Sequence, residues 1–466
     1  MFLKDNSKHS INNKIELDWL GTLSEKTLAE LLNGSGNSVF VLTSGNKDVT
    51  NSLLKQFVVN LQKEDGKDIA ITNNLVGFIG QSNNQLSICS RFCKIDETKD
   101  EQEDYFLHYL LSKVFAFNLV DFKHNMQQAS FLNLLFCLFP KFLNDAMSQG
   151  IYRKYQKKSF NNDKVHGNID ISRHLKLNMP NNGRIAYDCR ELSQDNDVTQ
   201  LIRHTIEFIK EKSFGNSILN RQAETRSNVL ALINSTSSYR KQDRVKIIAQ
   251  NRKIVVHPYY TKYVMLQKLC IAILRREDFK YKKSESSFFG LIIDMAWLWE
   301  EYIATLLIKL EFKHPMNLGG SGAVCFGAKI NGNSYENLEE SDLRFNSIRR
   351  FPDFYWGRYT KNTIIVDAKY KNYIDADREL ERNDVNQMLA YLYGMKGKYA
   401  LILCPGSSLD EEYEYALFGW GELNQARLIV KNIEIKQSFV DLNDCLISME
   451  NSENKLTGFI KNLQES

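Results

Sequence analysis

Thr363-Ile364-Ile365-Val366-Asp367-Ala368-Lys369 is an apolar run that ends in Asp-x-Lys, and Arg350-Phe351-Pro352-Asp353 lies shortly before it. Because β-branched residues favour strands, the run predicts a buried β-strand with ionic residues at its end. Charged groups there are costly unless they are paired or bind a metal. The carboxylates of Asp353 and Asp367 and the backbone carbonyl of Ala368 are oxygen ligands that suit Mg²⁺. The two stretches therefore predict a metal site.

Lys369 adds a positive charge to this pattern. Its ammonium group could orient or activate an attacking water and offset the charge on a pentavalent phosphate. The pattern is short, however, and a chain with 60 Lys and Arg and 56 Asp and Glu contains such pairs by chance. An edge hairpin with a surface Asp–Lys pair is the alternative, and the local pattern leaves both interpretations open.

A helix is predicted upstream, over residues 294–307. Apolar residues recur there at helical spacing, and Asp294 is a suitable N-cap. Glu300 lies near the rim of the apolar stripe, from which it could reach a metal. Alternatively, Glu300 and Glu301 are both part of the solvated face, and the sequence leaves open which of them is a ligand.

A second helix is predicted downstream, over residues 384–393, followed by an apolar strand over 399–404. Gln387 and Tyr391 are four residues apart and share one face of this helix. The order helix, strand, strand, helix, strand predicts an α/β sandwich with a mixed sheet. The metal carboxylates would lie at the strand ends, where such folds place their sites.

In this order, the residues resemble the PD-(D/E)xK nuclease superfamily. The matching motifs are Glu300 on a helix, Pro352-Asp353, Asp367-Ala368-Lys369 and Gln387-x-x-x-Tyr391, the last being typical of the RecB-like branch. Three further segments resemble, more narrowly, the McrC nuclease subunit of McrBC-type restriction systems, including their LlaJI-like relatives. These segments are Leu75 to Phe92, Asp104 to Leu111, and His166 to His204, so the resemblance covers roughly residues 70–410.

The resemblance implies a fold, a cofactor and roles for the site residues. The fold is an α/β nuclease domain with a mixed sheet flanked by helices, and the cofactor is Mg²⁺, for which Mn²⁺ could substitute. The metal ligands would be Glu300, Asp353 and Asp367, with Lys369 as catalytic lysine and Gln387 and Tyr391 near the active site and the DNA backbone. Residues 1–70, residues 318–340 and the last 45 residues receive no role.

The chain lacks the Gly-x-x-x-x-Gly-Lys-Ser/Thr loop, so we expect it to bind no nucleotide by that means. The resemblance implies a separate motor, a McrB-like AAA+ GTPase that recognises and translocates double-stranded DNA. The chain would then be the endonuclease subunit of a restriction complex in phage defence. An autonomous RecB-like DNA repair nuclease and a non-catalytic adaptor that activates an AAA+ motor are the alternatives. A double-strand break further implies self-association through the nuclease domain.

Length and patterning predict three segments in the 466 residues. Residues 1–120 form a β-rich N-terminal domain in which partner docking is expected, residues 121–285 are mainly helical, and residues 286–466 form the nuclease domain. The net charge of +4 is small for a stand-alone DNA binder. Four basic residues near the site could contact phosphates, or could be solvated hairpin charges: Arg349, Arg350, Arg358 and Lys361.

Other features are less specific. Eight scattered cysteines without a Cys-x-x-Cys pair argue against zinc and fit buried thiols in a cytoplasmic protein. The most apolar segment, residues 131–142, is too short and interrupted to span a membrane. Asp195-Asn196 precede a predicted helix, and capping of that helix is favoured over contact with a partner. The last 45 residues predict a short helix and a strand or two.

Overall fold

A computed structural model describes residues 1–34, 37–44, 47–82, 84–93, 104–115, 131–212, 214–281, 288–315, 323–327, 347–357, 362–371, 373, 380–407, 412–417 and 426–465. The chain divides into two compact units, one formed by residues 1–120 with 287–466 and the other by residues 121–286. The segments predicted as an N-terminal domain and a nuclease domain are thus parts of the same unit.

One strand, β11, explains why those two segments form one unit. The first sheet has the order β1 (Phe2–Lys4), β7 (Asn84–Cys89), β6 (Leu75–Gln81), β11 (Phe288–Asp294) and β3 (Ser38–Leu42). In it, β11 is antiparallel to β6 and parallel to β3. Both hydrogen-bonded neighbours of β11 therefore come from the first 120 residues.

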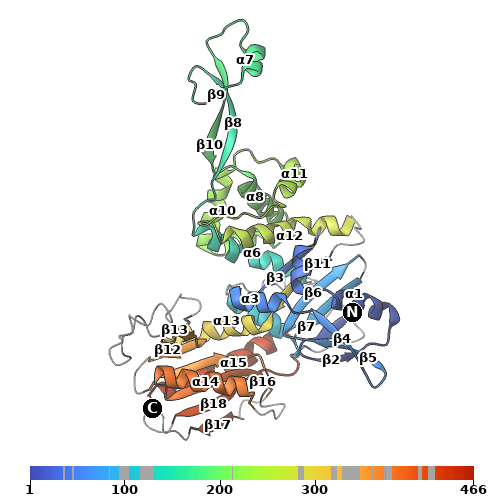
Figure 1. Ribbon diagram of the computed structural model, residues 1–466, viewed down its shortest axis with the longest axis vertical. Helices are drawn as coiled ribbons and strands as arrows, with labels where there is room; N and C mark the ends of the chain where they lie inside the picture. Colours follow the sequence, from blue (N-terminus) through green and yellow to red (C-terminus); the bar gives the residue numbers. More distant parts are fainter. Residues whose placement is uncertain are drawn as a thin grey trace. The chain divides into compact units, whose positions relative to one another are not determined.

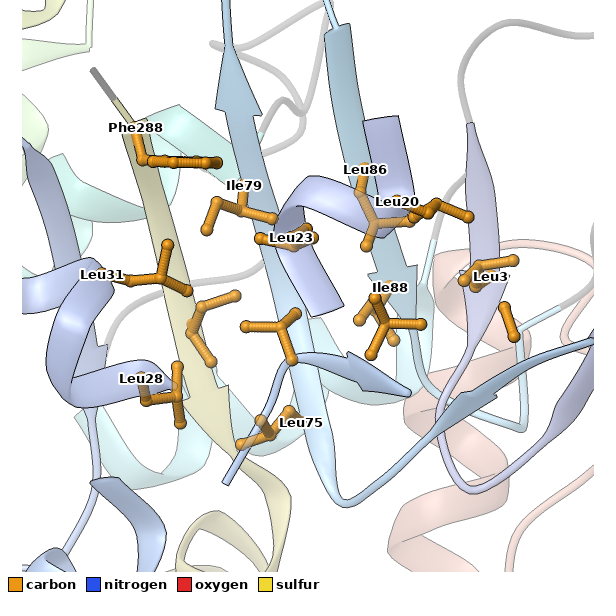
Figure 2. Packing of buried hydrophobic residues seen from close by; sticks show 14 of the residues in the cluster. Leu3, Leu20, Leu23, Leu28, Leu31, Leu75, Ile79, Leu86, Ile88 and Phe288 are labelled. Carbon is orange, nitrogen blue, oxygen red and sulfur yellow. The ribbon is translucent and has the colours of Figure 1, made fainter. Parts of the chain in front are cut away.

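Two short helices cover one face of this sheet. Figure 2 shows Leu23 of α1 (Lys14–Ser24) beside Ile79 of β6, and Leu28 and Leu31 of α2 (Leu28–Asn33) beside β11. Thr27 and Glu30 form a capping box that begins α2. A small sheet of β2 (Lys8–Ser10), β5 (Lys67–Thr72) and β4 (Val59–Glu64) adds to this core.

The predicted mixed sheet is present in the C-terminal half. Its order is β14 (Phe354–Trp356), β15 (Ile364–Ala368), β16 (Tyr399–Gly406), β18 (Arg427–Glu434) and β17 (Glu412–Ala416). The three central strands are parallel, and the two edge strands are antiparallel to their neighbours. Helix α14 (Arg382–Met395) packs on this sheet through Met388, Tyr391 and Leu392. The predicted α/β arrangement is therefore confirmed at the level of the sheet and its helices.

Helix α13 (Met295–Leu307) follows β11 directly, and Asp294 caps it as predicted by accepting a hydrogen bond from Ala296 N–H at 3.0 Å. The prediction of a short helix near the C-terminus was wrong, because α15 (Leu442–Glu465) is long. Its buried Glu453 accepts hydrogen bonds from Tyr302 of α13 and from Tyr109 of α4 (Tyr105–Phe115). One carboxylate thus connects three helices that are distant in sequence.

The remaining elements of this unit are small. They are α3 (Lys47–Leu54), the 3₁₀ turn Ile308–Leu310, and a two-stranded sheet of β12 (Ala323–Gly327) and β13 (Ser347–Arg350). Most of the stretch 318–340 lies outside the described residues.

The second unit is mainly helical, as predicted for residues 121–285. Its helices are α6 (Phe131–Met147), α8 (Asp197–Lys210), α9 (Gly215–Asn220), α10 (Ala223–Ser235), α11 (Arg244–Gln250) and α12 (Tyr263–Tyr281), with a 3₁₀ turn at Lys241–Asp243. Asn196 caps α8 through a reciprocal pair with Thr199, which confirms the predicted cap.

An unexpected hairpin arm projects from these helices (Figure 1). It consists of β8 (Lys154–Asn162) paired antiparallel with β10 (Ile185–Ser193), with β9 (Asn168–Ile169) and α7 (Ile171–Leu177) at the far end. Sequence patterning missed it because β8 is largely exposed and polar and has no apolar face. Several apolar side chains of the arm are exposed: Tyr155, Ile169, Ile171, Leu175, Leu177, Met179 and Leu192.

Two further expectations concern membranes and cysteines. Within the described ranges, no helix is long and apolar enough to cross a membrane. The seven cysteines that the structure describes are free thiols, and six of them are buried.

Gly77 and Gly290 allow β6 and β11 to approach closely. Gly77 has φ +131°, and a Cβ there would lie 2.0 Å from the carbonyl oxygen of Leu291. We expect Gly77→Ala to lower the free energy of unfolding by about 2–3 kcal/mol, because the strained backbone and the clash act together. Urea unfolding followed by tryptophan fluorescence reports on this unit, since the tryptophans that the structure describes, at positions 19, 297, 299 and 356, belong to it.

Gly21 in α1 provides the matched control, because a Cβ at that position meets nothing within 4 Å. Gly21→Ala should stabilise the protein by about 0.5–1 kcal/mol. Unchanged stability of Gly77→Ala would show that the two strands can separate there without cost.

Candidate active site

The predicted site residues gather around one cavity of about 780 Å³ in the first unit. Five of the predicted side chains, together with Ala368, line it: Glu300, Asp353, Lys369, Gln387 and Tyr391. Asp367 does not line the cavity, because its side chain is only 1% exposed and lies beneath Lys369. Residues scattered over the sequence from Glu300 to Tyr391 are therefore brought together.

Strand pairing places the two aspartates next to each other. Phe354 at the start of β14 pairs with Val366 of β15, and the strands run antiparallel. Asp353 precedes β14 while Ala368 ends β15, so these residues meet at one end of the strand pair. The Ala368 N–H donates a hydrogen bond of 2.8 Å to Asp353 Oδ2.

The two aspartates are buried and repel each other. Burial raises the pKa of the Asp353 carboxyl well above its usual range, and the negative charges of Asp367 and Glu300 raise it further. Burial also raises the pKa of Asp367, although the positive charge of Lys369 opposes this rise. Such crowded carboxylates favour binding of a cation.

Lys369 places a positive charge next to these carboxylates. Its Nζ lies 2.7 Å from Asp367 Oδ2 and 3.7 Å from Asp384 Oδ1, and it donates a hydrogen bond of 3.2 Å to Gln387 Oε1. Burial tends to lower the pKa of Lys369, but the charges of Asp367 and Asp353 outweigh it and raise this pKa above its ordinary value. Lys369 therefore remains protonated, which suits charge stabilisation and water orientation rather than proton abstraction.

Gln387 and Tyr391 connect helix α14 to the two strands. Gln387 Nε2 donates to Tyr391 Oη at 2.8 Å, and it lies 3.4 Å from Asp367 Oδ1. Tyr391 in turn donates a 2.7 Å hydrogen bond to the carbonyl of Phe351, just before Pro352-Asp353. The two residues on the predicted helix face thus hold the lysine and both aspartate-bearing segments together.

Glu300 faces the same carboxylates from α13. Burial raises the pKa of Glu300 to about 7, with the charges of Glu301 and Asp367 adding to the rise. The charge of Glu300 in turn acts on Asp353. Both adjacent glutamates line the cavity, and Glu300 is the one whose charge acts on Asp353.

His314 is a site residue that the sequence did not reveal. Its Nε2 lies 3.5 Å from Glu300 Oε1, and its ring packs on Phe354 at 4.5 Å between centroids. Burial lowers the pKa of this imidazole, so it is neutral near pH 7. No motif or spacing in the sequence connects His314 to Glu300.

Other site residues also went unpredicted. Asp384 in the first turn of α14 pairs with Lys371 at 2.8 Å and accepts a hydrogen bond from Tyr373. Its position three residues before Gln387 was an available signal. Ser44 and Asn74, which line the cavity from the N-terminal segment, left no such signal.

The predicted basic residues are only partly described. Arg350 is exposed and lines the cavity. The side chain of Arg349 and the whole of Arg358 and Lys361 lie outside the described residues.

The donor atoms fit a divalent metal in kind. Asp367 Oδ2 is buried and pairs with Lys369 Nζ at 2.7 Å, and an ionised carboxylate oxygen can accept a second electropositive partner. Such an oxygen retains capacity for a cation, and carboxylates are the ligands that Mg²⁺ takes. Within the part of the chain that the structure describes, however, no group of three or more His, Cys, Asp or Glu side chains is arranged to hold a metal ion.

The raised pKa of Glu300 leads to a prediction about how the stability of the protein depends on pH. Because its folded-state pKa lies above the ordinary value of 4.5, the folded state binds this proton more tightly, and stability falls as the pH rises from about 4.5 towards 7. We expect Glu300→Gln to stabilise the metal-free protein by about 1 kcal/mol at about pH 8, and by less at about pH 5.5. Urea unfolding in the presence of a chelator measures both.

Glu301→Gln is the matched control, with a smaller gain, since it removes only the repulsion between the two neighbours. Equal stabilities of the wild type and Glu300→Gln at high pH would show that Glu300 is not under repulsion.

Comparison with known proteins identifies a family. No curated protein matches the chain. Two solved structures from Thermococcus gammatolerans match at 14% identity, one described as McrB AAA+ hexamers with bound McrC and one as the McrBC complex. The first has a TM-score of 0.46 and covers 98% of this chain and 99% of the matched chain. The second has a TM-score of 0.31 and covers 66% and 87%. At these scores neither likeness carries an argument.

The family model is the stronger finding. It describes the McrBC 5-methylcytosine restriction system component and matches residues 70–404. This range covers well over half of the chain and includes every predicted site residue, from Glu300 to Tyr391. The chain belongs to the family of McrBC 5-methylcytosine restriction system components.

Proposed function

We propose that this chain is the nuclease subunit of a McrBC-type restriction complex and cleaves DNA phosphodiester bonds with Mg²⁺. One observation supports this most strongly. Side chains from separate parts of the sequence form one hydrogen-bonded and ion-paired group beside a single cavity, and the members of this group are Asp353, Asp367, Lys369, Gln387 and Tyr391. Family membership agrees with a restriction role.

The side chains have distinct tasks in this proposal. Asp353 and Asp367, with Glu300 from α13, would hold Mg²⁺, and the Ala368 carbonyl would add an oxygen. When bound, the metal supplies Lewis-acid stabilisation and lowers the pKa of water. Lys369, which remains charged, faces the phosphate and offsets negative charge that develops on it. Arg350, exposed at the same cavity, suits a neighbouring backbone phosphate.

Gln387 keeps Lys369 in place. Its Oε1 accepts from the ammonium group, while its Nε2 donates to Tyr391, which is itself anchored on the carbonyl of Phe351. The amide therefore fixes the lysine relative to the segment that carries Asp353. Fixed donors cost no reorganisation during the reaction, which is the main source of their catalytic value.

We further propose that DNA recognition and translocation come from a McrB-like AAA+ GTPase. The chain has no phosphate-binding Walker loop, and its net charge of +4 is small for gripping DNA alone. The hairpin arm of the second unit is the proposed docking element, because exposed apolar side chains gather on it, including Ile171 and Leu175 of α7.

The catalytic assignment predicts loss of cleavage in single variants. Asp353→Ala and Asp367→Ala should abolish cleavage of a DNA plasmid in the presence of Mg²⁺ and the GTPase partner. Lys369→Ala should reduce the rate by about 10²–10³-fold, because it removes a positioned charge from the transition state. Single-turnover rates measure the three variants.

Arg427→Ala is the matched control, since Arg427 pairs with Glu414 across the neighbouring strands β18 and β17 of the same sheet, and it does not line the cavity. We expect it to retain most of the activity, because such partly exposed ion pairs contribute little. Wild-type rates in both aspartate variants would favour the non-catalytic adaptor. Strong cleavage by the chain without any motor would favour the autonomous repair nuclease.

In this proposal the site cleaves DNA and the hairpin arm stimulates the GTPase. Single variants should therefore lose one of these activities and keep the other. Asp367→Ala should still raise the GTP turnover of the partner, because the arm is intact. Ile171→Asp should reduce that stimulation by about tenfold, since a charge placed in an apolar contact costs over 1 kcal/mol. GTP turnover is measured at a fixed excess of each variant.

The matched control is Val256→Asp, which alters a side chain of the same unit that is 93% exposed and lies outside the arm. It should stimulate like the wild type. If Ile171→Asp also stimulates fully, the docking surface lies elsewhere.

A further inference from the structure

A buried polar cluster lies next to the candidate site and is not used by the proposed chemistry. Two buried carboxylates hold the segment Ser90-Arg91, which follows β7. One of them, Asp5, precedes the segment in the sequence, and the other, Asp104, follows it. Asp5 accepts a 2.6 Å hydrogen bond from the Arg91 backbone N–H. Asp104 accepts one of 2.8 Å from the Ser90 hydroxyl and one of 3.0 Å from Leu107 N–H. The backbone of Arg91 is therefore fixed.

The Arg91 side chain reaches the residue that follows the candidate catalytic lysine. Its guanidinium carbon lies 4.4 Å from the ring centroid of Tyr370, well within cation–π distance. Tyr370 is only 2% exposed, and the ring of Trp299 from α13 lies 6.4 Å away. Tyr370 is thus enclosed by a residue of the N-terminal segment and a residue of α13.

Strand β15 ends before Lys369, so other contacts must fix the lysine. Its backbone N–H still donates to the carbonyl of Leu403 at 3.0 Å, which also accepts from the Trp299 indole at 3.1 Å. Beyond that point the ring of Tyr370 is the next anchor of the chain. Fixing this ring fixes the intervening peptide, and with it the direction in which the Lys369 side chain leaves the backbone.

Arg91 is a poor choice for packing alone. Its Nε and Nη2 are buried and have no hydrogen-bond acceptor among the described residues. Buried donors without partners cost free energy, and apolar side chains in place of both buried charges, Arg91 and Asp5, are often as stabilising or more so. Asp5 also bears a cost, since burial raises its pKa to about 7 despite the nearby Arg91 charge. The cluster therefore calls for a role besides stability.

We infer that Arg91 is a positioning residue for Lys369, acting through the ring of Tyr370, and that the N-terminal segment thereby completes the nuclease site. This inference rests on the proposed function. It follows that residues 287–466 are not an autonomous nuclease, because they lack the side chain that holds Tyr370.

The test uses the full chain with its GTPase partner, GTP, Mg²⁺ and a DNA substrate. Arg91→Met and Tyr370→Leu should lower the single-turnover cleavage rate by about 10–100-fold, since a misplacement of about 1 Å can have that effect. DNA affinity should stay unchanged. Tyr370→Phe, which keeps the ring, should cleave like the wild type, and Arg91→Lys, which keeps a weaker cation–π contact, should lose only about threefold.

Arg203→Met is the matched control, because Arg203 lies 4.9 Å over the ring of Tyr239 in the other unit. It should leave the cleavage rate unchanged. A variant that folds poorly gives less active protein but the same single-turnover rate constant. This rate constant therefore distinguishes a positioning role of Arg91 from a purely structural role. If Arg91→Met does not fold, the Tyr370→Leu and Tyr370→Phe pair decides.

The outcomes distinguish this inference from the proposed function. If the wild type does not cleave with its partner, the proposed function fails. If the wild type cleaves and Asp367→Ala does not, the function stands. In that case, wild-type rates in Arg91→Met and Tyr370→Leu overturn the positioning role of Arg91, as would a Tyr370→Phe variant as slow as Tyr370→Leu.

Discussion

The pairing of β11 with strands from the first 120 residues is the constraint on which the candidate site depends. Its hydrogen bonds to β6 and β3 fix a strand that leads directly into α13. Asp294 at the junction caps α13 and accepts a hydrogen bond of 3.3 Å from Thr43. The N-terminal sheet therefore sets the direction of the helix that carries Glu300. The first 120 residues and the C-terminal segment cannot be separated without breaking that sheet.

The candidate site contains three carboxylates that are close together and largely buried. Asp353, Asp367 and Glu300 all have pKa values raised chiefly by burial and further by neighbouring charge. A fold selected only for stability would replace such groups, because isolated buried charges are costly. Lys369 offsets part of the repulsion, and a divalent cation would offset more. Groups whose pKa values are shifted in this way are typical of functional sites, and the proposed function assigns them to metal binding.

Local signals in the sequence predicted the elements that carry the candidate site residues. The β-branched run before Asp367 became β15, the N-cap at Asp294 begins α13, and the spacing of Gln387 and Tyr391 placed both on one helix face. These features depend on backbone propensity and on neighbours a few residues apart, which a sequence displays directly. The polar hairpin arm was missed because its strands bury no apolar face.

The sequence by itself determined which carboxylates, lysine and amide are available at the candidate site, and it predicted the strand and helices that carry them. Tertiary structure alone decided that the charge of Glu300 acts on Asp353, that His314 approaches Glu300, that Ser44 and Asn74 line the cavity, and that Arg91 packs on Tyr370. The reason is physical. Periodicity and propensity act over a few residues, whereas these contacts join residues far apart in the chain, and strand pairing and burial settle them only when the whole unit folds.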